Sequence, residues 1–250
     1  MSVASGEKAD ICSFCMCTNH PADKGLLEME HTHRTWDIFD PALDMTFCLL
    51  HMKLRITEKL FQLAVEEAYS NQKKTALQSE VRDLGVNMTI QRTKTKKGLK
   101  MSITSMNGRD CEKVMAAYSS WVPSCGANPE TCAQMLDLWK AYNKLFHGLN
   151  GRYDTSIGPG PDILDDLRKT QVQFGETFLD LYDKSDVTPY IHVLTEHSVD
   201  HLERFKALWR YSNEGFEHAN KRHRYWYGRC TQRGGICGRR NQYTKPRRIT

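Results

Sequence analysis

The chain has 250 residues and a mass of 28.9 kDa, and 40% of the residues are hydrophobic, which excludes a wholly disordered protein. It has no apolar run of about 18 residues, the length that a membrane-spanning helix needs, and its polar start does not resemble a secretory signal. Residues 221–250 contain ten Lys and Arg and no acid, whereas residues 1–220 contain 25 bases and 30 acids. This asymmetry favours a phosphate-bearing or acidic partner at the basic end, or a basic end that only keeps the chain soluble.

The cysteine content points to reduced thiols. Nine cysteines accompany ten histidines. An odd number of cysteines without an expected secretory signal favours metal ligation over a disulfide framework. We therefore expect an intracellular protein, and the basic clusters at residues 239–240 and 245–248 favour nuclear localisation.

The first segment, residues 1–44, is predicted to contain a zinc knuckle. It includes the stretch DICSFCMCTNH, in which Cys12 and Cys15 have the two-residue separation typical of half a tetrahedral zinc site. Cys17 and His20 offer a local way to complete the site. Their links of one and two residues are short for four ligands that must surround one ion.

A second pair of zinc ligands lies far along the chain. His192 and His197 are separated by four residues, which falls within the range seen for paired zinc histidines. In this alternative the metal ties the amino-terminal segment to a late helix. A C-x-x-C with a matching H-x4-H is a stronger indication of zinc than either motif alone.

A helical region is predicted for residues 45–148. Apolar residues recur at steps of three and four, as expected for amphipathic helices. Gly85 ends the second helix, and Asn128 with Pro129 resembles a helix start. The predicted elements are helices over 45–69, 75–84, 109–118 and 129–147, a β-hairpin formed by 88–92 and 99–104, and a loop over 121–131.

A Gly- and Pro-rich linker is predicted at residues 149–161, followed by a second helical region over 162–228. This region has three expected helices: one over 162–182, one that Thr188 and Pro189 open and that contains both histidines, and one over 214–227. The tail, residues 229–250, is predicted to be basic and disordered. The fold class is therefore mainly α. The apolar face expected for the first of these helices consists of Ile163, Leu167, Val172, Phe178 and Leu181.

Four blocks of the sequence resemble, in the same order, the carboxyl-terminal part of recombination-activating protein 1 and of Transib-type transposases, which are Asp-Asp-Glu recombinases. The blocks are CSFC (12–15), FCLLHMKLRITEKLFQLAVEEAY (47–69), ITSMNGRDCEKVM with SSWVPSCGANPETC (103–132), and TPYIHVLTEHSVDHL through YSNEGFEHANK (188–221). The last block is the most specific, because it combines the histidine pair with a glutamate twenty residues later.

The resemblance implies a zinc-stapled helical region of an RNase H-like recombinase, followed by its terminal catalytic helix. It assigns the zinc ligands to Cys12, Cys15, His192 and His197. The expected cofactor is therefore Zn.

The resemblance also implies that Glu217 is the last member of an Asp-Asp-Glu triad, which holds two Mg²⁺ or Mn²⁺ ions at a phosphodiester. In the family both aspartates lie on sheet strands before the C-x-x-C, and here only eleven residues precede Cys12. Asp10 is too close to the knuckle to match either of them. We therefore expect most of the sheet, and two of the three carboxylates, to be missing from this chain.

The predicted function is a fragment or domesticated relic of such a recombinase that binds zinc and DNA and does not cleave DNA alone. A second hypothesis is an active transposase or endonuclease, with Mg²⁺ or Mn²⁺, completed by upstream sequence or by another chain. The expected partners are DNA and either a second copy of this chain, in a homodimer, or a chain that supplies the missing aspartates. A third is a zinc-stabilised helical adaptor that binds a protein. We expect no membrane partner.

Contact with DNA is predicted at the basic end of the chain. This contact is expected to be independent of base sequence and to weaken steeply with salt, because phosphates supply the attraction. Tyr225, Trp226 and Tyr227 are available for packing or base stacking. The phosphate contacts are assigned to Lys221, Arg222, Arg224, Arg229 and Arg233.

Overall fold

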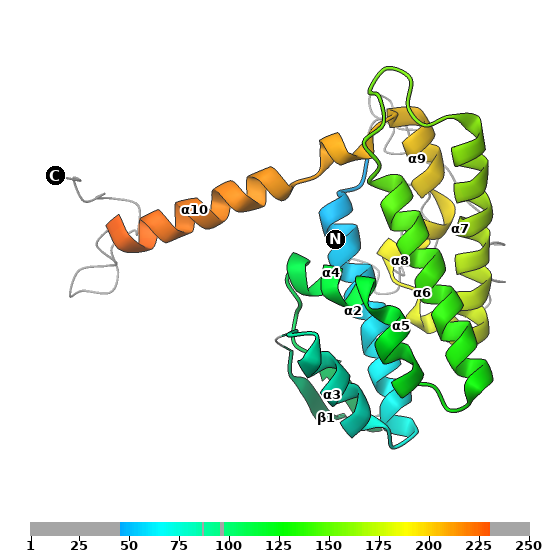
Figure 1. Cartoon of the computed structure of the whole chain (residues 1–250). Helices are drawn as coiled ribbons and strands as arrows, with labels where there is room; N and C mark the ends of the chain where they lie inside the picture. Colours follow the sequence, from blue (N-terminus) through cyan, green and yellow to red (C-terminus); the bar gives the residue numbers. More distant parts are fainter. Residues whose placement is uncertain (1–45, 87, 96–97, 231–250) are drawn as a thin grey trace, which may run out of the picture. The chain divides into compact units, whose positions relative to one another are not determined.

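The computed structural model of the chain describes residues 46–86, 88–95 and 98–230 (Figure 1). It consists of two compact units, Met1–Tyr211 and Ser212–Thr250. The described residues are mainly helical and contain one two-stranded sheet, which confirms the mainly α class. The elements are α2 (Leu49–Ser70), α3 (Lys74–Asp83), β1 (Ile90–Thr95), β2 (Gly98–Ile103), α4 (Gly108–Ala116), α5 (Tyr118–Trp121), η2 (Val122–Ser124), α6 (Pro129–Leu149), α7 (Pro161–Leu181), η3 (Lys184–Asp186), α8 (Pro189–Glu196), α9 (Ser198–Phe205), η4 (Leu208–Tyr211) and α10 (Glu214–Cys230).

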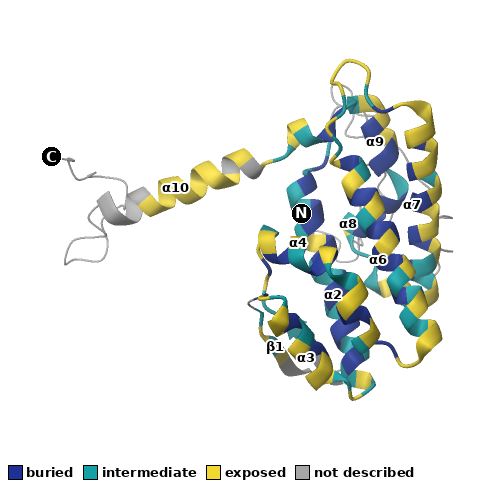
Figure 2. Ribbon diagram, viewed as in Figure 1, coloured by how far each residue is buried: buried dark blue, intermediate teal, exposed yellow. Residues whose placement is uncertain are grey.

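Helix α2 is the central helix of the first unit. It contacts α3, α4, β2, α8 and η4, and it is buried over most of its circumference (Figure 2). A helix that is apolar on most sides is stable only when other elements cover it. Its fully buried apolar side chains include Met52, Ile56, Leu60, Phe61, Ala64, Val65 and Ala68.

Helices α6 and α7 pack against each other along their length (Figure 1). A side chain at Gly148 of α6 would overlap Leu167 of α7, so the glycine permits the close approach. Tyr153 in the connection donates a hydrogen bond to the Gly148 carbonyl at 2.8 Å. The segment predicted as a linker, residues 149–161, therefore joins two neighbouring helices, and the boundary between the two compact units falls after Tyr211.

A row of aromatic rings runs through the core of the first unit. Trp121 lies at the end of α5, is fully buried, and donates its indole N–H to the Val114 carbonyl at 3.0 Å. The loop predicted over 121–131 is wrong at its start, because Trp121 is the last residue of α5 and Val122–Ser124 form the 3₁₀-helix η2. The rings follow the order Phe61, Trp121, Trp139, Tyr142 and Phe174, with centroids 5.0, 5.0, 6.0 and 6.2 Å apart.

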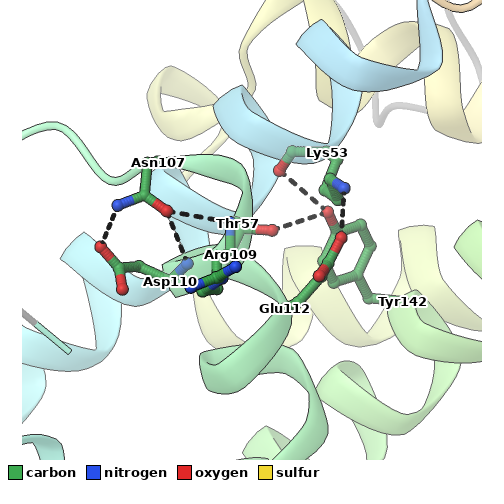
Figure 3. A network of polar contacts seen from close by, with 7 residues as sticks. All are labelled: Lys53, Thr57, Asn107, Arg109, Asp110, Glu112 and Tyr142. Carbon is green, nitrogen blue, oxygen red and sulfur yellow. Dashed lines mark hydrogen bonds and ion pairs between the residues drawn. The ribbon is translucent and has the colours of Figure 1, made fainter. Parts of the chain in front are cut away.

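Two buried polar side chains of α2 have partners on other helices (Figure 3). Lys53 pairs with Glu112 of α4 at 2.8 Å. The Thr57 hydroxyl lies 2.9 Å from the Tyr142 hydroxyl, which in turn donates to the Lys53 carbonyl at 3.2 Å. Because that carbonyl only accepts, Thr57 is the donor in its bond with Tyr142. These bonds satisfy polar groups that would be costly to bury alone.

Asn107 caps the start of α4 (Figure 3). Its side-chain oxygen accepts from the backbone N–H groups of Arg109 and Asp110 at 2.9 and 3.0 Å, and its amide nitrogen donates to the Asp110 carboxylate at 2.6 Å. Such caps satisfy N–H groups that have no partner within a helix. The helix predicted after the Asn-Gly pair is confirmed.

The predicted β-hairpin is also confirmed. Strands β1 and β2 pair antiparallel, with Ile90 opposite Ile103 and Thr95 opposite Gly98. The hairpin is joined to α2 by Gln62, whose amide donates to the Met101 carbonyl at 3.2 Å. Within the described ranges, no helix is both long and apolar enough to cross a membrane.

Candidate metal and nucleic-acid sites

Thr188 fixes the start of the helix that carries the first histidine. Its hydroxyl oxygen accepts from the Ile191 N–H at 3.3 Å, and Pro189 occupies the first helical position. His192 follows one turn later, with its N–H bonded to the Thr188 carbonyl at 3.0 Å. The helix start predicted from Thr-Pro is confirmed.

The helix is interrupted at the second histidine. His197 has φ −125° and ψ −18°, so α8 ends before it and α9 begins after it. The Thr195 hydroxyl donates to the His192 carbonyl at 3.1 Å, and the Ser198 hydroxyl donates to the Leu194 carbonyl at 2.7 Å. Hydroxyls that bond to carbonyls of the preceding turn compete with the helical ladder and bend it. The sequence predicted one continuous helix here, and the structure has two.

The interruption brings the two imidazoles together. His192 is fully buried and His197 is half-buried, and their ring centroids are 5.1 Å apart with an angle of 72° between the planes. Two imidazoles on one tetrahedral zinc, with Zn–N distances of about 2.05 Å, have centroids about 5.2 Å apart. The centroid separation of the histidine pair is that of two imidazoles on one zinc ion, and it is also that of an ordinary edge-to-face ring contact.

A neighbouring helix holds the interrupted backbone in place. Gln171 of α7 is buried and donates its amide to the Leu194 carbonyl at 3.0 Å. The same carbonyl accepts from the Ser198 hydroxyl. Because the Leu194 carbonyl accepts both of these hydrogen bonds, it fixes the turn between His192 and His197. Gln171 was not among the site residues expected from the sequence, because a polar residue at an apolar helix interface has no periodic signal.

A third histidine lies next to the pair. His201 is one turn after His197, its ring centroid is 6.5 Å from that of His197, and it packs against Phe47 at 5.4 Å. Burial lowers the pKa of His201 to about 4, nearby His197 and Arg204 act in the same direction, and Asp200 opposes the shift. His201 is therefore neutral at physiological pH. The sequence indicated this third histidine only by its spacing, because His201 follows His197 by four residues, or about one helical turn.

Half of the proposed zinc ligand set belongs to residues that the structure does not describe. Cys12 and Cys15 fall there, as do the local alternatives Cys17 and His20. Across residues 46–86, 88–95 and 98–230, no three Cys, His, Asp or Glu side chains form a group that could hold a metal. The structure therefore brings together one histidine pair, and the thiol half of the site stays a prediction.

Glu217 lies in the first turn of α10, in the second unit. Its side chain is exposed, and its N–H bonds to the Asn213 carbonyl at 2.9 Å. Lys221 and Arg224 follow at steps of four and three, which places them on the same face of the helix as Glu217. The helix over 214–227 that the sequence predicted is confirmed.

The predicted DNA-contacting residues are distributed along α10 and beyond it. Lys221, Arg222 and Arg224 are exposed. Arg229 belongs to the last turn of α10, and Arg233 lies outside the described residues. An exposed basic helix presents a positive surface to a phosphate backbone.

Comparisons with known proteins do not assign this chain to a family. No family model matches the chain, and no curated protein sequence matches it either. Any function must therefore be argued from the residues themselves and from the geometry of the histidine pair and of α10.

Proposed function

We propose that the chain is a zinc-stabilised helical part of an Asp-Asp-Glu recombinase, which binds DNA through its basic end and does not cleave DNA alone. The observation that carries this proposal is the 5.1 Å approach of the His192 and His197 rings. Support also comes from the resemblance of the four sequence blocks. The complete ligand set is Cys12, Cys15, His192 and His197.

The zinc has a structural role in this proposal. Two thiolates and two imidazoles close the tetrahedron and leave no open position for substrate. The ion ties residues far apart in the sequence to the junction of α8 and α9, which Thr188 and Gln171 already hold. A structural zinc contributes on the order of 10 kcal/mol to folding in small peptide systems.

Metal analysis of the purified full chain tests the zinc site. We expect about one zinc per chain, and we expect the zinc to be lost in both Cys15→Ser and His197→Ala. His147→Ala is the matched control, because His147 is an exposed histidine of α6. If His197→Ala keeps the zinc and His20→Ala loses it, the local site is correct. A chain without zinc contradicts both sites.

DNA binding is proposed to depend on the exposed basic residues of α10. Neutralising Lys221, Arg222 and Arg224 to Gln should lower the slope of log affinity against log salt by about 2.7, or about 0.9 for each lost phosphate contact. The probe is a duplex of random sequence, followed by fluorescence anisotropy between 50 and 200 mM salt. Neutralising Lys169, an exposed lysine of α7, is the control. An affinity that does not change with salt contradicts the proposal.

Catalysis is proposed to require carboxylates that this chain does not supply. Glu217 alone offers too few oxygens to hold two metal ions at a phosphodiester. A nicking assay with Mg²⁺ or Mn²⁺ should show no product with this chain alone. Product from a mixture with a second polypeptide or from an upstream-extended chain, lost again in Glu217→Gln, would favour the active-enzyme hypothesis instead.

A further inference from the structure

Asparagine is followed by glycine at two places in the chain, Asn107 before Gly108 and Asn150 before Gly151, and in both places arginine comes next. Both asparagines are exposed. Glycine has no Cβ, so its backbone nitrogen can approach the side-chain carbonyl carbon of the asparagine before it. The two pairs therefore share the same chemistry and the same following residues, and the fold holds them differently.

The first pair is held by the cap of α4 (Figure 3). The Asn107 side-chain oxygen accepts from two backbone N–H groups, and its amide nitrogen donates to the Asp110 carboxylate at 2.6 Å. Gly108 is the first residue of α4. Its nitrogen can attack the Asn107 side chain only if these bonds break and the first helical turn opens. The cap therefore protects the amide of Asn107.

The second pair lies at the carboxyl-terminal end of a helix. Asn150 directly follows α6, and the Gly151 N–H bonds to the Gly148 carbonyl at 3.2 Å. Across the described residues, no hydrogen bond holds the Asn150 side chain. Helix ends open at a lower cost in free energy than helix interiors. The amide of Asn150 is therefore restrained by the backbone turn and not by bonds of its own.

The ring of Tyr153 limits the motion of this turn. A Cβ on Gly151 would lie 2.5 Å from the Tyr153 Cζ, so the ring lies close against the glycine. The Tyr153 hydroxyl donates to the Gly148 carbonyl, the same carbonyl that accepts from the Gly151 N–H. Attack by the Gly151 nitrogen therefore requires local opening of this turn, and it should be slower in the folded chain than in the unfolded chain.

We propose that Asn150 deamidates spontaneously in the folded chain, whereas the cap of α4 protects Asn107. The Gly151 nitrogen forms a bond to the Asn150 Cγ, the Cγ–Nδ2 bond breaks, and ammonia leaves with the proton of the Gly151 N–H. Water then opens the succinimide ring at one of its carbonyls, which gives aspartate or isoaspartate. The reaction consumes water and requires no enzyme, metal or DNA.

The product should disturb the contact between α6 and α7. It places a carboxylate at the carboxyl-terminal end of α6, where the helix dipole is already negative. The isoaspartate product also adds a carbon to the main chain of the connection between the helices. This connection begins just after Gly148, at which a side chain would overlap Leu167 of α7. Deamidation should therefore weaken the packing of α6 on α7.

Peptide mapping by mass spectrometry follows both asparagines in one sample of the full chain. In urea the two pairs should react at similar rates. In the folded chain at neutral pH, Asn107 should react at least about tenfold more slowly than Asn150, because Asn107 must give up a hydrogen bond to a charged group. Equal rates in the folded chain overturn the proposal. It is also overturned if Asn150 stays intact in the folded chain while both pairs react in urea.

Variants at Asp110 test the protecting cap. Asp110→Ala removes the acceptor of the Asn107 amide, so it should speed deamidation of Asn107 about tenfold and leave Asn150 unchanged. Asp110→Asn keeps an acceptor oxygen on a side chain of the same length and should have a smaller effect. Circular dichroism checks that both variants fold. An Asn107 rate that neither variant alters overturns the protection by the cap.

Thermal melting tests the consequence for stability. Asn150→Asp reproduces one product, and Asn150→Gln keeps the amide on a side chain that is too long to form the succinimide. Asn150→Gln should block the reaction, and Asn150→Asp should melt at a lower temperature than Asn150→Gln, because the new charge opposes the helix dipole. Equal melting temperatures overturn this part of the proposal. None of these measurements requires bound zinc or DNA, so their outcome is independent of the proposed function.

Discussion

Helices α2 and α10 have similar lengths, 22 and 17 residues, and opposite surroundings. Ile56, Leu60 and Phe61 of α2 are fully buried, whereas every described side chain of α10 from Glu217 to Tyr225 is exposed (Figure 2). Most helical stability in proteins comes from packing of an apolar face. The difference therefore separates a helix that the fold requires from a helix that is available to a partner.

The charged residues of the two helices differ in the same way. Lys53 of α2 is 5% exposed and is held by Glu112 of α4. Lys221 and Arg222 of α10 are exposed, so a phosphate can reach them without breaking the core. Substitutions in the two helices should therefore have opposite consequences, large for folding in α2 and large for binding in α10.

The largest expected effect is a truncation in α2. Phe61→Ala removes a fully buried ring that lies 5.0 Å from Trp121, and it should lower the free energy of unfolding by about 3–5 kcal/mol. Tyr225→Ala in α10 should change it by less than about 0.5 kcal/mol, because Tyr225 is 51% exposed. Urea denaturation followed by circular dichroism measures both. Similar losses would contradict the division between the two helices.

The next effect is a loss of stability in alkali, which should come from the core around α2. Burial raises the pKa of Cys111 and of Cys125 to about 12, from 9.0. The folded state therefore keeps thiol protons that the unfolded state releases above pH 9. Stability should be unaffected below pH 9 and fall by about 1.4 kcal/mol per pH unit per thiol as the pH rises toward 12.

Urea denaturation at pH 7 and pH 10 measures this slope. Cys125→Ala and Cys111→Ala should each reduce the slope by the contribution of one thiol. A slope that Cys125→Ala does not alter would show that other groups account for the alkaline loss.

The sequence predicted most elements, because their caps and periodicity are local. It was less successful on α7, where Ile163 and Val172, assigned to the apolar face, are 44% and 42% exposed. The buried face instead includes Thr170 and Gln171. Gln171 is buried because it bonds to the Leu194 carbonyl at the interruption after α8, and this partner is 23 residues away. Hydrophobic periodicity contains no information about such a bond.

The spacing of the two candidate histidine ligands could be recognised in the sequence, whereas the backbone conformation between them could not. The H-x4-H motif identified His192 and His197, whereas an uninterrupted helix would separate residues five apart by about 140° around its axis. The interruption at His197 brings the rings together, and it depends on hydroxyl bonds from Thr195 and Ser198. Serine and threonine do not always form such bonds, so their presence in the sequence did not predict the bend.

A smaller effect is expected at two glycines in contrasting surroundings. A Cβ at Gly126 would lie 2.9 Å from the Cys132 backbone nitrogen, which cannot move freely, so Gly126→Ala should destabilise the first unit by about 1–3 kcal/mol. Gly215 in α10 has no heavy atom within 4 Å of the added carbon, and Gly215→Ala should stabilise that helix by up to about 1 kcal/mol. Denaturation measures the first, and helical circular dichroism measures the second. A stabilising Gly126→Ala would contradict the tight packing.

The smallest effect is expected at Lys206, between α9 and η4. This residue has φ +64° and ψ −37°, and the Ala207 N–H bonds to the Phe205 carbonyl at 2.7 Å, which defines a γ-turn in a strained region. Lys206→Gly relieves the strain and loses the packing of the lysine stem on Gly158, so we expect a gain of about 0.5 kcal/mol. Lys206→Ala, which loses the same stem and keeps the strain, is the control and should be destabilising. Lys206 precedes the boundary at Tyr211 and so belongs to the first unit. Lys206→Gly should therefore raise the free energy of unfolding of the first unit and leave the helicity of α10 unchanged. Equal losses in both variants would mean that stem packing outweighs backbone strain.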